Sequence, residues 1–292
     1  MLPFFYITEN LQIIDDFIIY MWYNRVSDLT DFVSDKTQRQ MRKDFIIMTF
    51  WEIISRVYNG GIFSFLSGGD DLTAVILTGV GVFVSLVAGY LLGSFNPAIH
   101  FSKKLYGEDI RKSGSGNAGS TNMLRTHGKK AGLITALCDL GKTVIACLIG
   151  YLCIGYNGAA LAGFGTLLGH IAPVFYKFKG GTGVMVAAAT VLMLDPITFL
   201  ICIAIFAGVF YISRTVSIAS IMAVLVYPMI LNRVGNYVGI SLICAILTTV
   251  VVFFMHRENI SRIFAGTEPK TTIGGNKNKK NANEDENGDS EN

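Results

Sequence analysis

Long apolar runs separated by short polar segments dominate the chain between residues 72 and 256. A membrane-spanning helix needs about 20 mostly apolar residues, and seven segments are candidates. They cover residues 72–99, 130–155, 158–176, 180–194, 196–212, 216–231 and 237–256. The runs are continuously apolar rather than alternating, and a helix satisfies its own backbone hydrogen bonds in lipid. The sequence therefore predicts an all-α polytopic membrane protein with seven transmembrane helices.

The segments on either side of these runs are less regular. Residues 1–71 form an N-terminal extension with an apolar stretch, 44–66, that contains Glu52 and Arg56. We expect this extension to be amphipathic at the membrane interface or to add one further helix. Residues 72–268 form the membrane domain, and residues 269–292, rich in Asn, Lys and acidic residues, predict a disordered polar tail.

Basic residues are distributed unevenly between the loops. They follow the first, third, fifth and seventh candidate spans, whereas the intervening loops contain only Arg233. Loops rich in Lys and Arg face the cytoplasm. We therefore expect a multi-pass protein of the cell membrane in which loops one, three and five and the C-terminus are cytoplasmic.

Pairs of glycines four residues apart recur within the apolar runs. Such pairs let helix backbones approach closely in lipid. They predict close packing at Gly89 with Gly93 and at Gly165 with Gly169.

The strongest functional signal is the segment 109–125, DIRKSGSGNAGSTNMLR. Its glycines let the backbone approach a ligand and leave amide groups exposed, and its basic residues add fixed positive charge. Such a loop suits an anion, above all a phosphate. The residues concerned are Gly114, Ser115, Gly116, Asn117, Gly119, Asn122 and Arg125. An ordinary polar loop between two spans is the alternative.

Three further clusters lie at span ends that the charge bias places on the same side. They are residues 169–183 with His170, Lys179, Gly180 and Gly181; residues 214–220 with Ser217 and Ser220; and residues 256–260 with His256 and Asn259. Taken singly, they also fit a basic membrane anchor, helix-packing serines and an interfacial histidine. His256 and Asn259 share a face only if the last helix continues. Together, the four clusters favour a shared site on one face of the membrane.

Two charged residues, Asp139 and Lys142, lie inside the second candidate span. They are on the order of 15 Å beyond its basic entry, where charges are costly and usually pair or serve function. We expect a buried ion pair, with a proton or ion pathway as the alternative.

Other patterns do not carry a function. Residues 114–119 match G-x-G-x-x-G, but a dinucleotide fingerprint follows a strand, and this one follows a span. Residues 141–143 resemble the end of a P-loop, but Ala136 stands where the first glycine is required. The five cysteines form no C-x-x-C pair and carboxylates are few, so we expect no metal and no cofactor.

These motifs together resemble the PlsY family, bacterial membrane acyltransferases that use acyl phosphate to acylate glycerol 3-phosphate. The similarity covers residues 86–270 and includes several motifs in the same order. They are Gly93-Ser94, Asp109-Ile-Arg111, Gly114-Ser-Gly-Asn117, Thr121-Asn122, Arg125, Gly128-Lys-Lys-Ala-Gly132, Asp139, Lys142, Gly169-His170, Phe178-Lys-Gly-Gly181, Ser217, Ser220, Pro228 and His256-Arg-x-Asn-Ile260.

The resemblance implies a seven-helix fold whose substrates, acyl phosphate and glycerol 3-phosphate, meet at the cytoplasmic surface of the bilayer. The products would be 1-acyl-sn-glycerol 3-phosphate (lysophosphatidic acid) and phosphate, the first step of phospholipid biosynthesis. It also implies catalysis without a covalent acyl-enzyme, with a substrate phosphate oxygen helping to take the proton. Nothing in the sequence points to nucleic acid.

Carried over by position, the resemblance implies two sets of site residues. The catalytic set is Ser115, Lys179, His256 and Asn259; the phosphate-binding set is Gly114, Gly116, Asn117, Gly119, Asn122, Arg125, Gly180, Gly181 and Ser217. The chain departs from the family pattern at Thr182, where a second lysine is usual, and at Ser120, where alanine is usual.

Other functions make different predictions. An acyl-CoA-dependent acyltransferase typically has a His-x-x-x-x-Asp pair, and none of the four histidines has an aspartate five positions on. A multispan transporter would be supported by an inverted repeat. A non-catalytic homologue, marked by Thr182, is the third alternative.

Overall fold

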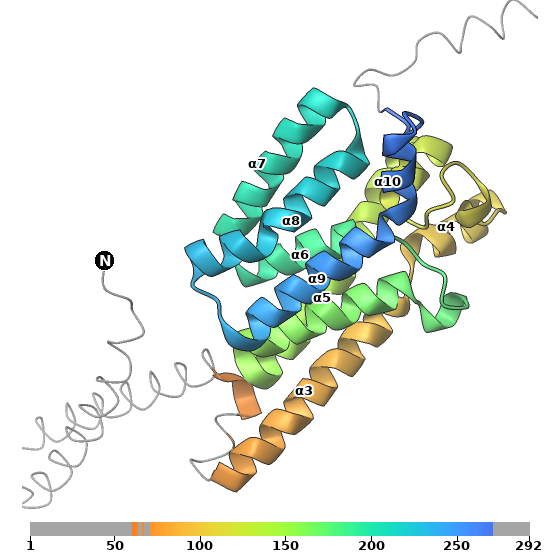
Figure 1. The fold of residues 1–292 in the computed structure, drawn as a ribbon. Coiled ribbons are helices and arrows are strands. Elements are labelled where there is room, and N and C mark those ends of the chain that lie inside the picture. The colour runs from red at the N-terminus through yellow and green to blue at the C-terminus, as the bar shows by residue number, and fades with distance from the viewer. Residues whose placement is uncertain (1–59, 64–65, 67–70, 271–292) are drawn as a thin grey trace, which may run out of the picture. The chain divides into compact units, whose positions relative to one another are not determined.

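The computed structural model describes residues 60–63, 66 and 71–270 (Figure 1). The predictions made for the extension (1–71) and the polar tail (269–292) therefore fall almost entirely outside the described residues. Within those residues every regular element is a helix and no strand occurs. The predicted all-α class is confirmed for this part of the chain.

The described helices follow one another with short connections. They are α3 (Asp71–Ser94), α4 (Pro97–Tyr106), η1 (Ile110–Lys112), α5 (Ser120–Ile171), η2 (Val174–Tyr176), α6 (Val184–Leu194), α7 (Pro196–Ser213), α8 (Val216–Gly235), α9 (Gly239–Met255) and α10 (Arg257–Phe264).

The long helix α5 contains two breaks. Gly128 has non-helical torsions, and so do Ile154 and Gly155. Beyond the second break the chain folds back against the first part of α5. The two parts approach so closely that a Cβ on Gly150 would collide with the carbonyl of Gly158 and touch Ala162. Twelve residues of straight helix would separate Gly150 from Ala162 by about 18 Å. The two predicted spans 130–155 and 158–176 are thus two arms of α5, and the second arm ends at Ile171.

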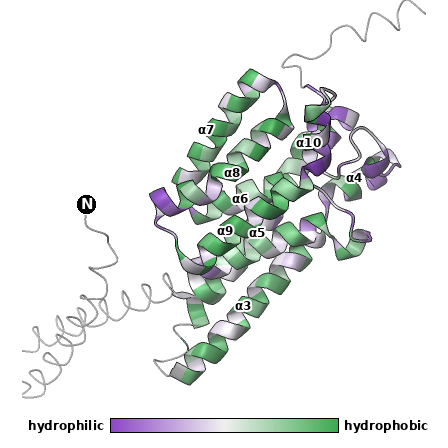
Figure 2. Cartoon of the chain, in the orientation of Figure 1, coloured by the Kyte–Doolittle hydropathy of each residue, from purple (hydrophilic) through white to green (hydrophobic). Residues whose placement is uncertain are grey.

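Hydrophobic residues dominate the helices in Figure 2, and many large hydrophobic side chains are exposed, which suits a bilayer. Four described helical stretches are long and apolar enough to cross a membrane, and the bent pair α9 and α10 would make a fifth. α6, with 11 residues, is short and apolar. Each of the seven predicted spans coincides with a helical segment, but the count of seven crossings stays a prediction.

Some predicted boundaries are wrong. The first span ends at Ser94 rather than residue 99, because Asn96 caps a new helix that begins at Pro97; proline disfavours helical torsions in the residue before it. α6 begins at Val184 rather than residue 180. The seventh predicted span, 237–256, matches α9. The helix does not continue straight beyond it, because α9 and α10 are bent by 53° at His256, so the condition under which His256 and Asn259 would share a helical face is not met.

The predicted glycine packing is confirmed, and it joins α3 to the second arm of α5. A Cβ on Gly89 would collide with the carbonyl of Ala162, and one on Gly169 with that of Tyr90. Gly93 meets Thr166 in the same way. This contact fixes the end of α3, from which α4 and the first glycine loop start.

Candidate active site

The first loop, residues 107–119, folds over the start of α5. Asp109 caps η1 by accepting a hydrogen bond from the Arg111 backbone N–H, with an Oδ1–N distance of 3.2 Å. Gly114 and Gly116 have φ values of 60° and 73°, in the left-handed region that favours glycine. A Cβ on Gly114 would also collide with Oδ1 of Asn122. Glycine therefore lets this loop close over the Asn122 side chain.

Asn122, predicted to bind phosphate, is the buried centre of this loop. Its Oδ1 accepts from the Ser115 backbone N–H at 2.9 Å. Its Nδ2 donates to the carbonyls of Ile110 (3.1 Å), Ser113 (2.9 Å) and Asn117 (3.0 Å). An amide has two donor hydrogens and one acceptor oxygen, so its side chain is fully engaged within the loop. The structure thus places Asn122 where it shapes the positions of Ser115 and Asn117.

The second loop, residues 172–183, lies against the end of α5. The backbone N–H groups of Gly180 and Gly181 donate to the carbonyls of Ile171 (2.9 Å) and His170 (3.1 Å). A Cβ on Gly180 would collide with the His170 carbonyl, so glycine permits this close approach. These bonds fix the glycines of the second loop to the helix end.

A strained turn precedes Lys179 in this loop. Lys177 and Phe178 have φ values of 59° and 55°, and a non-glycine residue in this region costs roughly 1–3 kcal/mol. Such a conformation persists only where surrounding contacts hold it. The turn therefore sets the direction in which the chain enters Lys179.

Ser217 and Asn259 meet around a carboxylate that the sequence reasoning missed. Glu268 accepts from the Ser217 hydroxyl at 2.5 Å, from Asn259 Nδ2 at 2.9 Å and from Arg262 Nε at 2.7 Å. Asn259 also donates to Ser217 Oγ at 2.9 Å. Burial alone would raise the pKa of Glu268, but these hydrogen bonds and the Arg262 charge outweigh it and hold that pKa below its usual value. The segment after α10 is thereby fastened to the start of α8.

His256 lies at the bend between α9 and α10 and is buried. Its Nδ1 is 2.8 Å from the Val252 carbonyl. A carbonyl only accepts, so Nδ1 carries the hydrogen and Nε2 of the neutral ring is the acceptor. The bend thus holds His256 in one tautomer.

Asp139 and Lys142 form the predicted ion pair, with Lys142 Nζ 2.8 Å from Asp139 Oδ1. His170 Nδ1 is 3.2 Å from the same oxygen. Lys142 Nζ also donates to the carbonyls of Gly93 (3.1 Å) and Phe95 (2.8 Å) at the end of α3. This cluster joins α3, both arms of α5 and, through the His170 backbone, the second loop.

One cavity of about 920 Å³ brings the four sequence clusters together. Its polar end is lined by Ser115, Gly116, Asn117, Gly119, Ser120, Thr121, Asn122, Arg125, Asp139, His170, Lys179, Gly180, Thr182, Ser217, Ser220, His256, Arg257, Glu258, Asn259 and Arg262. Of the predicted site residues, only Gly114 and Gly181 do not line it. Gly181 instead packs on His170, where a Cβ would collide with the imidazole.

The other part of the cavity is apolar. It is lined by side chains of α6, α7 and α8, among them Val191, Phe199, Phe206 and Tyr227. Ile203 of α7 lines this part of the cavity too. The cavity therefore combines a cationic, amide-rich end with an apolar end.

Residues 83–266 match the family model described as glycerol-3-phosphate acyltransferase. The chain belongs to this family. Two curated glycerol-3-phosphate acyltransferases illustrate the match. That of Thermoanaerobacter sp. strain X514 is 38% identical over 187 residues, 64% of this chain and 94% of the relative. That of Clostridioides difficile strain 630 is 40% identical over 195 residues, 63% of this chain and 92% of the relative.

Solved structures of an acyltransferase share the fold. The glycerol 3-phosphate form of PlsY (YgiH), an integral membrane glycerol 3-phosphate acyltransferase, has a TM-score of 0.62 and 35% identity, covering 65% of this chain and 96% of PlsY. Its lysophosphatidic acid form has a TM-score of 0.60 and the same identity, covering 65% and 95%. The present protein, as a member of this family with the same fold, is therefore a multi-pass integral membrane protein.

Two cations in the glycine loops, at the polar end of the acyltransferase cavity, are uncommitted within the part of the chain that the structure describes. The side chains of Arg125 and Lys179 are exposed and make no hydrogen bond or ion pair there. In contrast, Arg262 is bound by Glu268, and Arg111 is bound by Asp109. The positive charge available to a ligand thus comes from Arg125 in the first loop and Lys179 in the second, together with Arg257 at the start of α10, whose guanidinium lies 5.0 Å from the centroid of the Phe254 ring.

Sequence reasoning named most of this site but missed how it is held. One sequence feature could have indicated Glu268: it is the only acidic residue between Glu258 and residue 270, in a segment that is otherwise basic. Thr182, noted as a departure, faces the first loop, with Asn117 Nδ2 at 3.5 Å from its hydroxyl. A hydroxyl therefore stands where the family pattern has a lysine.

Proposed function

We propose that this protein transfers an acyl chain from acyl phosphate to glycerol 3-phosphate, giving 1-acyl-sn-glycerol 3-phosphate and phosphate. The single observation that supports this most is the two-part cavity, because the reaction joins a phosphorylated, water-soluble acceptor to an apolar chain. The related crystal structures are described as glycerol 3-phosphate and lysophosphatidic acid forms, which name the same acceptor and product.

The two glycine loops would hold the phosphates. Two anions brought side by side repel each other, so the site must supply fixed positive charge and hydrogen-bond donors. Arg125 and Lys179 provide exposed positive charge, and the Ser115 hydroxyl provides a neutral donor. The N–H groups of Gly180 and Gly181 are instead donated to the end of α5. Holding the reactants together in this way accounts for a large part of the rate.

The chemistry would proceed by direct attack. The sn-1 hydroxyl oxygen bonds to the acyl carbonyl carbon, the bond from that carbon to the phosphate oxygen breaks, and phosphate leaves with the electron pair. A phosphate oxygen accepts the hydroxyl proton. A nucleophilic serine needs an adjacent base, and within the described residues the Ser115 hydroxyl has no hydrogen-bond partner. This supports a role for Ser115 in binding substrate rather than in forming an acyl-enzyme.

The remaining predicted catalytic residues would orient the substrates. Nε2 of His256 is the ring nitrogen not engaged by Val252, so it can accept a hydrogen bond from a substrate hydroxyl. Ser217 and Asn259 both donate to Glu268, which holds these two side chains together at the wall of the cavity that both residues line. The apolar lining of α6, α7 and α8 would take the acyl chain.

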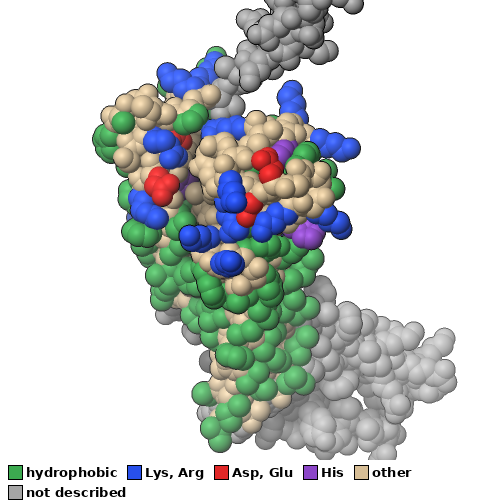
Figure 3. All heavy atoms as spheres, turned by 90° about the vertical axis from the view of Figure 1, so that its right-hand side faces the viewer, with side chains coloured by type: hydrophobic (Ala, Val, Ile, Leu, Met, Phe, Trp, Pro, Cys, Tyr) green, Lys and Arg blue, Asp and Glu red, His purple; other side chains and the backbone are tan. Residues whose placement is uncertain are grey.

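The polar cap would lie at the cytoplasmic face of the cell membrane. Figure 3 shows Lys and Arg side chains gathered over a cap, above a belt of hydrophobic side chains, and positive residues favour the cytoplasmic side. A membrane-impermeant maleimide should label Ser115→Cys and Lys179→Cys in inverted vesicles and not in intact spheroplasts, with the parent protein as the baseline. Labelling of the two positions from opposite sides would exclude a shared site.

The decisive assay measures phosphate release from palmitoyl phosphate by purified protein, with and without glycerol 3-phosphate. We expect release that depends on the acceptor and no turnover of palmitoyl-CoA. Lys179→Ala should lower kcat/KM about 10²–10³-fold, and Ser115→Ala at least about tenfold, whereas Lys104→Gln on the surface of α4 should match wild type. Preference for palmitoyl-CoA would refute the proposal, and glycerol 3-phosphate flux in proteoliposomes without acyl transfer would favour a transporter.

A further inference from the structure

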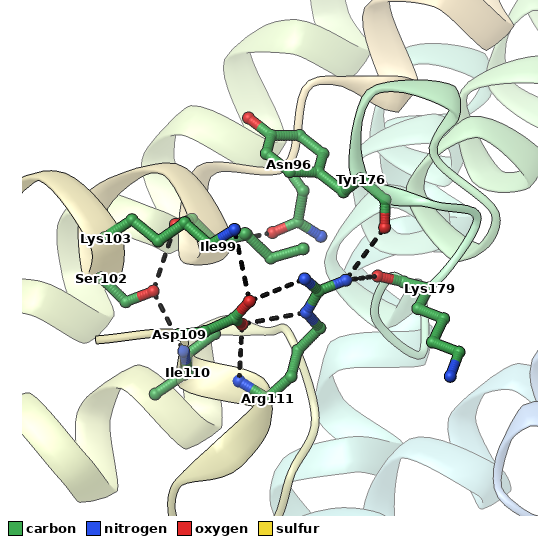
Figure 4. A network of polar contacts seen from close by, with 9 residues as sticks. All are labelled: Asn96, Ile99, Ser102, Lys103, Asp109, Ile110, Arg111, Tyr176 and Lys179. Carbon is green, nitrogen blue, oxygen red and sulfur yellow. Dashed lines mark hydrogen bonds and ion pairs between the residues drawn. The ribbon is translucent and has the colours of Figure 1, made fainter. Parts of the chain in front are cut away.

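Arg111 lies between the two phosphate loops, and Figure 4 shows its guanidinium surrounded by partners. Nη1 donates to the carbonyl of Tyr176 at 3.0 Å and to that of Lys179 at 2.9 Å. Nε and Nη2 donate to the two oxygens of Asp109 at 2.9 and 2.7 Å. Four of its five N–H groups are therefore engaged by the protein. This arginine is not organised to bind a substrate phosphate.

The two carbonyls that Arg111 contacts bracket the strained turn. Tyr176 precedes and Lys179 follows the left-handed residues Lys177 and Phe178. Within the turn itself, the backbone bonds run from Tyr176 and Phe178 to the Pro173 carbonyl, and the one from Lys179 to Tyr176 is long, at 3.4 Å. The guanidinium thus closes the open side of the turn and connects its two ends.

Asp109 holds the guanidinium in place. The pair is bidentate, a geometry that fixes the plane and direction of an arginine, and both side chains are largely buried, 15% exposed for Asp109 and 21% for Arg111. Lys103 Nζ lies 3.4 Å from the same carboxylate. The Arg111 contact holds the pKa of Asp109 well below its usual range, so the carboxylate stays charged at neutral pH.

We propose that Arg111, oriented by Asp109, is a positioning residue that sets the location of Lys179 relative to the first loop. This rests on the proposed role of Lys179 in holding a substrate phosphate. Figure 4 shows the Lys179 side chain extending away from Arg111 while its carbonyl is held. The clamp therefore fixes the backbone from which the Lys179 ammonium reaches into the cavity, without itself touching substrate.

The first test is a double-mutant cycle. Arg111→Lys keeps the charge but cannot span both carbonyls and both carboxylate oxygens. A misplacement of about 1 Å can cost 10²-fold in rate, so we expect kcat/KM for glycerol 3-phosphate to fall about 100-fold. In a Lys179→Ala background the same change should have little further effect, within about twofold. If the loss of kcat/KM in the double variant equals the product of the losses in the two single variants, the proposal is overturned, because Arg111 would then act independently of Lys179.

The second test does not depend on turnover. Hydrogen–deuterium exchange of a peptide covering residues 174–183 should become at least about tenfold faster in Arg111→Lys and in Asp109→Asn. Exchange in α8 should stay at the wild-type rate, which separates a local effect from unfolding. Lys104→Gln, which removes a nearby surface charge, should leave both regions unchanged.

The two tests separate the two proposals. Unchanged exchange in the turn would overturn the clamp even if the enzyme is active. A wild-type protein that releases no phosphate from acyl phosphate would refute the proposed reaction, while faster exchange in Arg111→Lys would still establish the clamp on the turn.

Discussion

Replacing Lys142 with methionine should destabilise the protein strongly and in a way that a second substitution partly reverses. Lys142 is 7% exposed, Asp139 is 1% exposed, and their charged atoms are 2.8 Å apart. Methionine matches the length of the lysine stem but carries no charge. Lys142→Met therefore leaves the Asp139 carboxylate buried without its lysine partner, although the His170 imidazole still lies beside it.

The size of the effect follows from the partners that are lost. Removing one member of a buried ion pair costs about 3–5 kcal/mol. Adding Asp139→Asn removes the uncompensated charge, and the remaining loss comes from the carbonyls of Gly93 and Phe95, at about 1–3 kcal/mol. At about 2–4 °C per kcal/mol for a domain of this size, Lys142→Met should lower the melting temperature by roughly 10 °C. The double variant should recover about half of that.

The chain supplies its own reporter for this measurement. All five cysteines are free, and Cys147 and Cys244 are buried. A maleimide dye that fluoresces on reaction with thiols therefore follows unfolding in detergent. Lys104→Met, an exposed lysine on α4, is the matched control and should melt with wild type. A wild-type melting temperature for Lys142→Met, or a double variant no more stable than the single one, would refute the charge-compensation argument.

Three further changes test other parts of the structure. The pKa of Glu268 is lowered from 4.5 on folding, so the stabilisation that its charge provides is complete above about pH 4.5 and is lost as the pH falls through the lower folded pKa. Glu268→Gln should therefore have a lower melting temperature than wild type at pH 7, and its melting temperature should depend less on pH in the acidic range. A melting profile identical to that of wild type would contradict this. Asn122→Ala removes the hydrogen bonds that shape the first loop, and we expect KM for glycerol 3-phosphate to rise at least about tenfold; an unchanged KM would show that the loop keeps its form without them. Gly169→Ala should cost about 1–3 kcal/mol in thermal unfolding because its Cβ meets the α3 backbone, whereas Gly141→Ala, with open space around it, should be neutral or stabilising; equal stability of the two would argue against tight packing.

The order of the helices could be read from the sequence because a span in lipid needs a long apolar run, and these runs are interrupted by charged loops. Close helix packing was also predictable from the glycine pairs Gly89 with Gly93 and Gly165 with Gly169, but the sequence did not indicate that these two pairs pack α3 against the second arm of α5. The break before Pro97 was missed because Asn96-Pro97 sits inside an otherwise apolar stretch. Hydropathy averages over such a cap, whereas the proline and the asparagine side chain determine where the helix ends.

The members of the site were easier to predict than their contacts. Clusters of glycine and basic residues recur at the span ends that the charge bias places on one side of the membrane. These clusters drew attention to Ser115, Lys179 and Asn259. The Arg111 contacts reach 65 and 68 positions along the chain, and the Ser217 contact with Glu268 spans 51. No local spacing encodes such pairs. Only the Asp139 and Lys142 pair, one helical turn apart, could be assigned from sequence.

The two-part cavity has a consequence for how the enzyme experiences its substrates. The acceptor is dissolved in water, whereas an acyl donor that enters between α6, α7 and α8 is dissolved in the bilayer. Saturation by the donor is then governed by its mole fraction in the membrane and not by its amount per volume of solution. Diluting the vesicles in buffer that keeps glycerol 3-phosphate at the same concentration should leave the rate per enzyme unchanged, whereas diluting the donor with inert phospholipid should lower it.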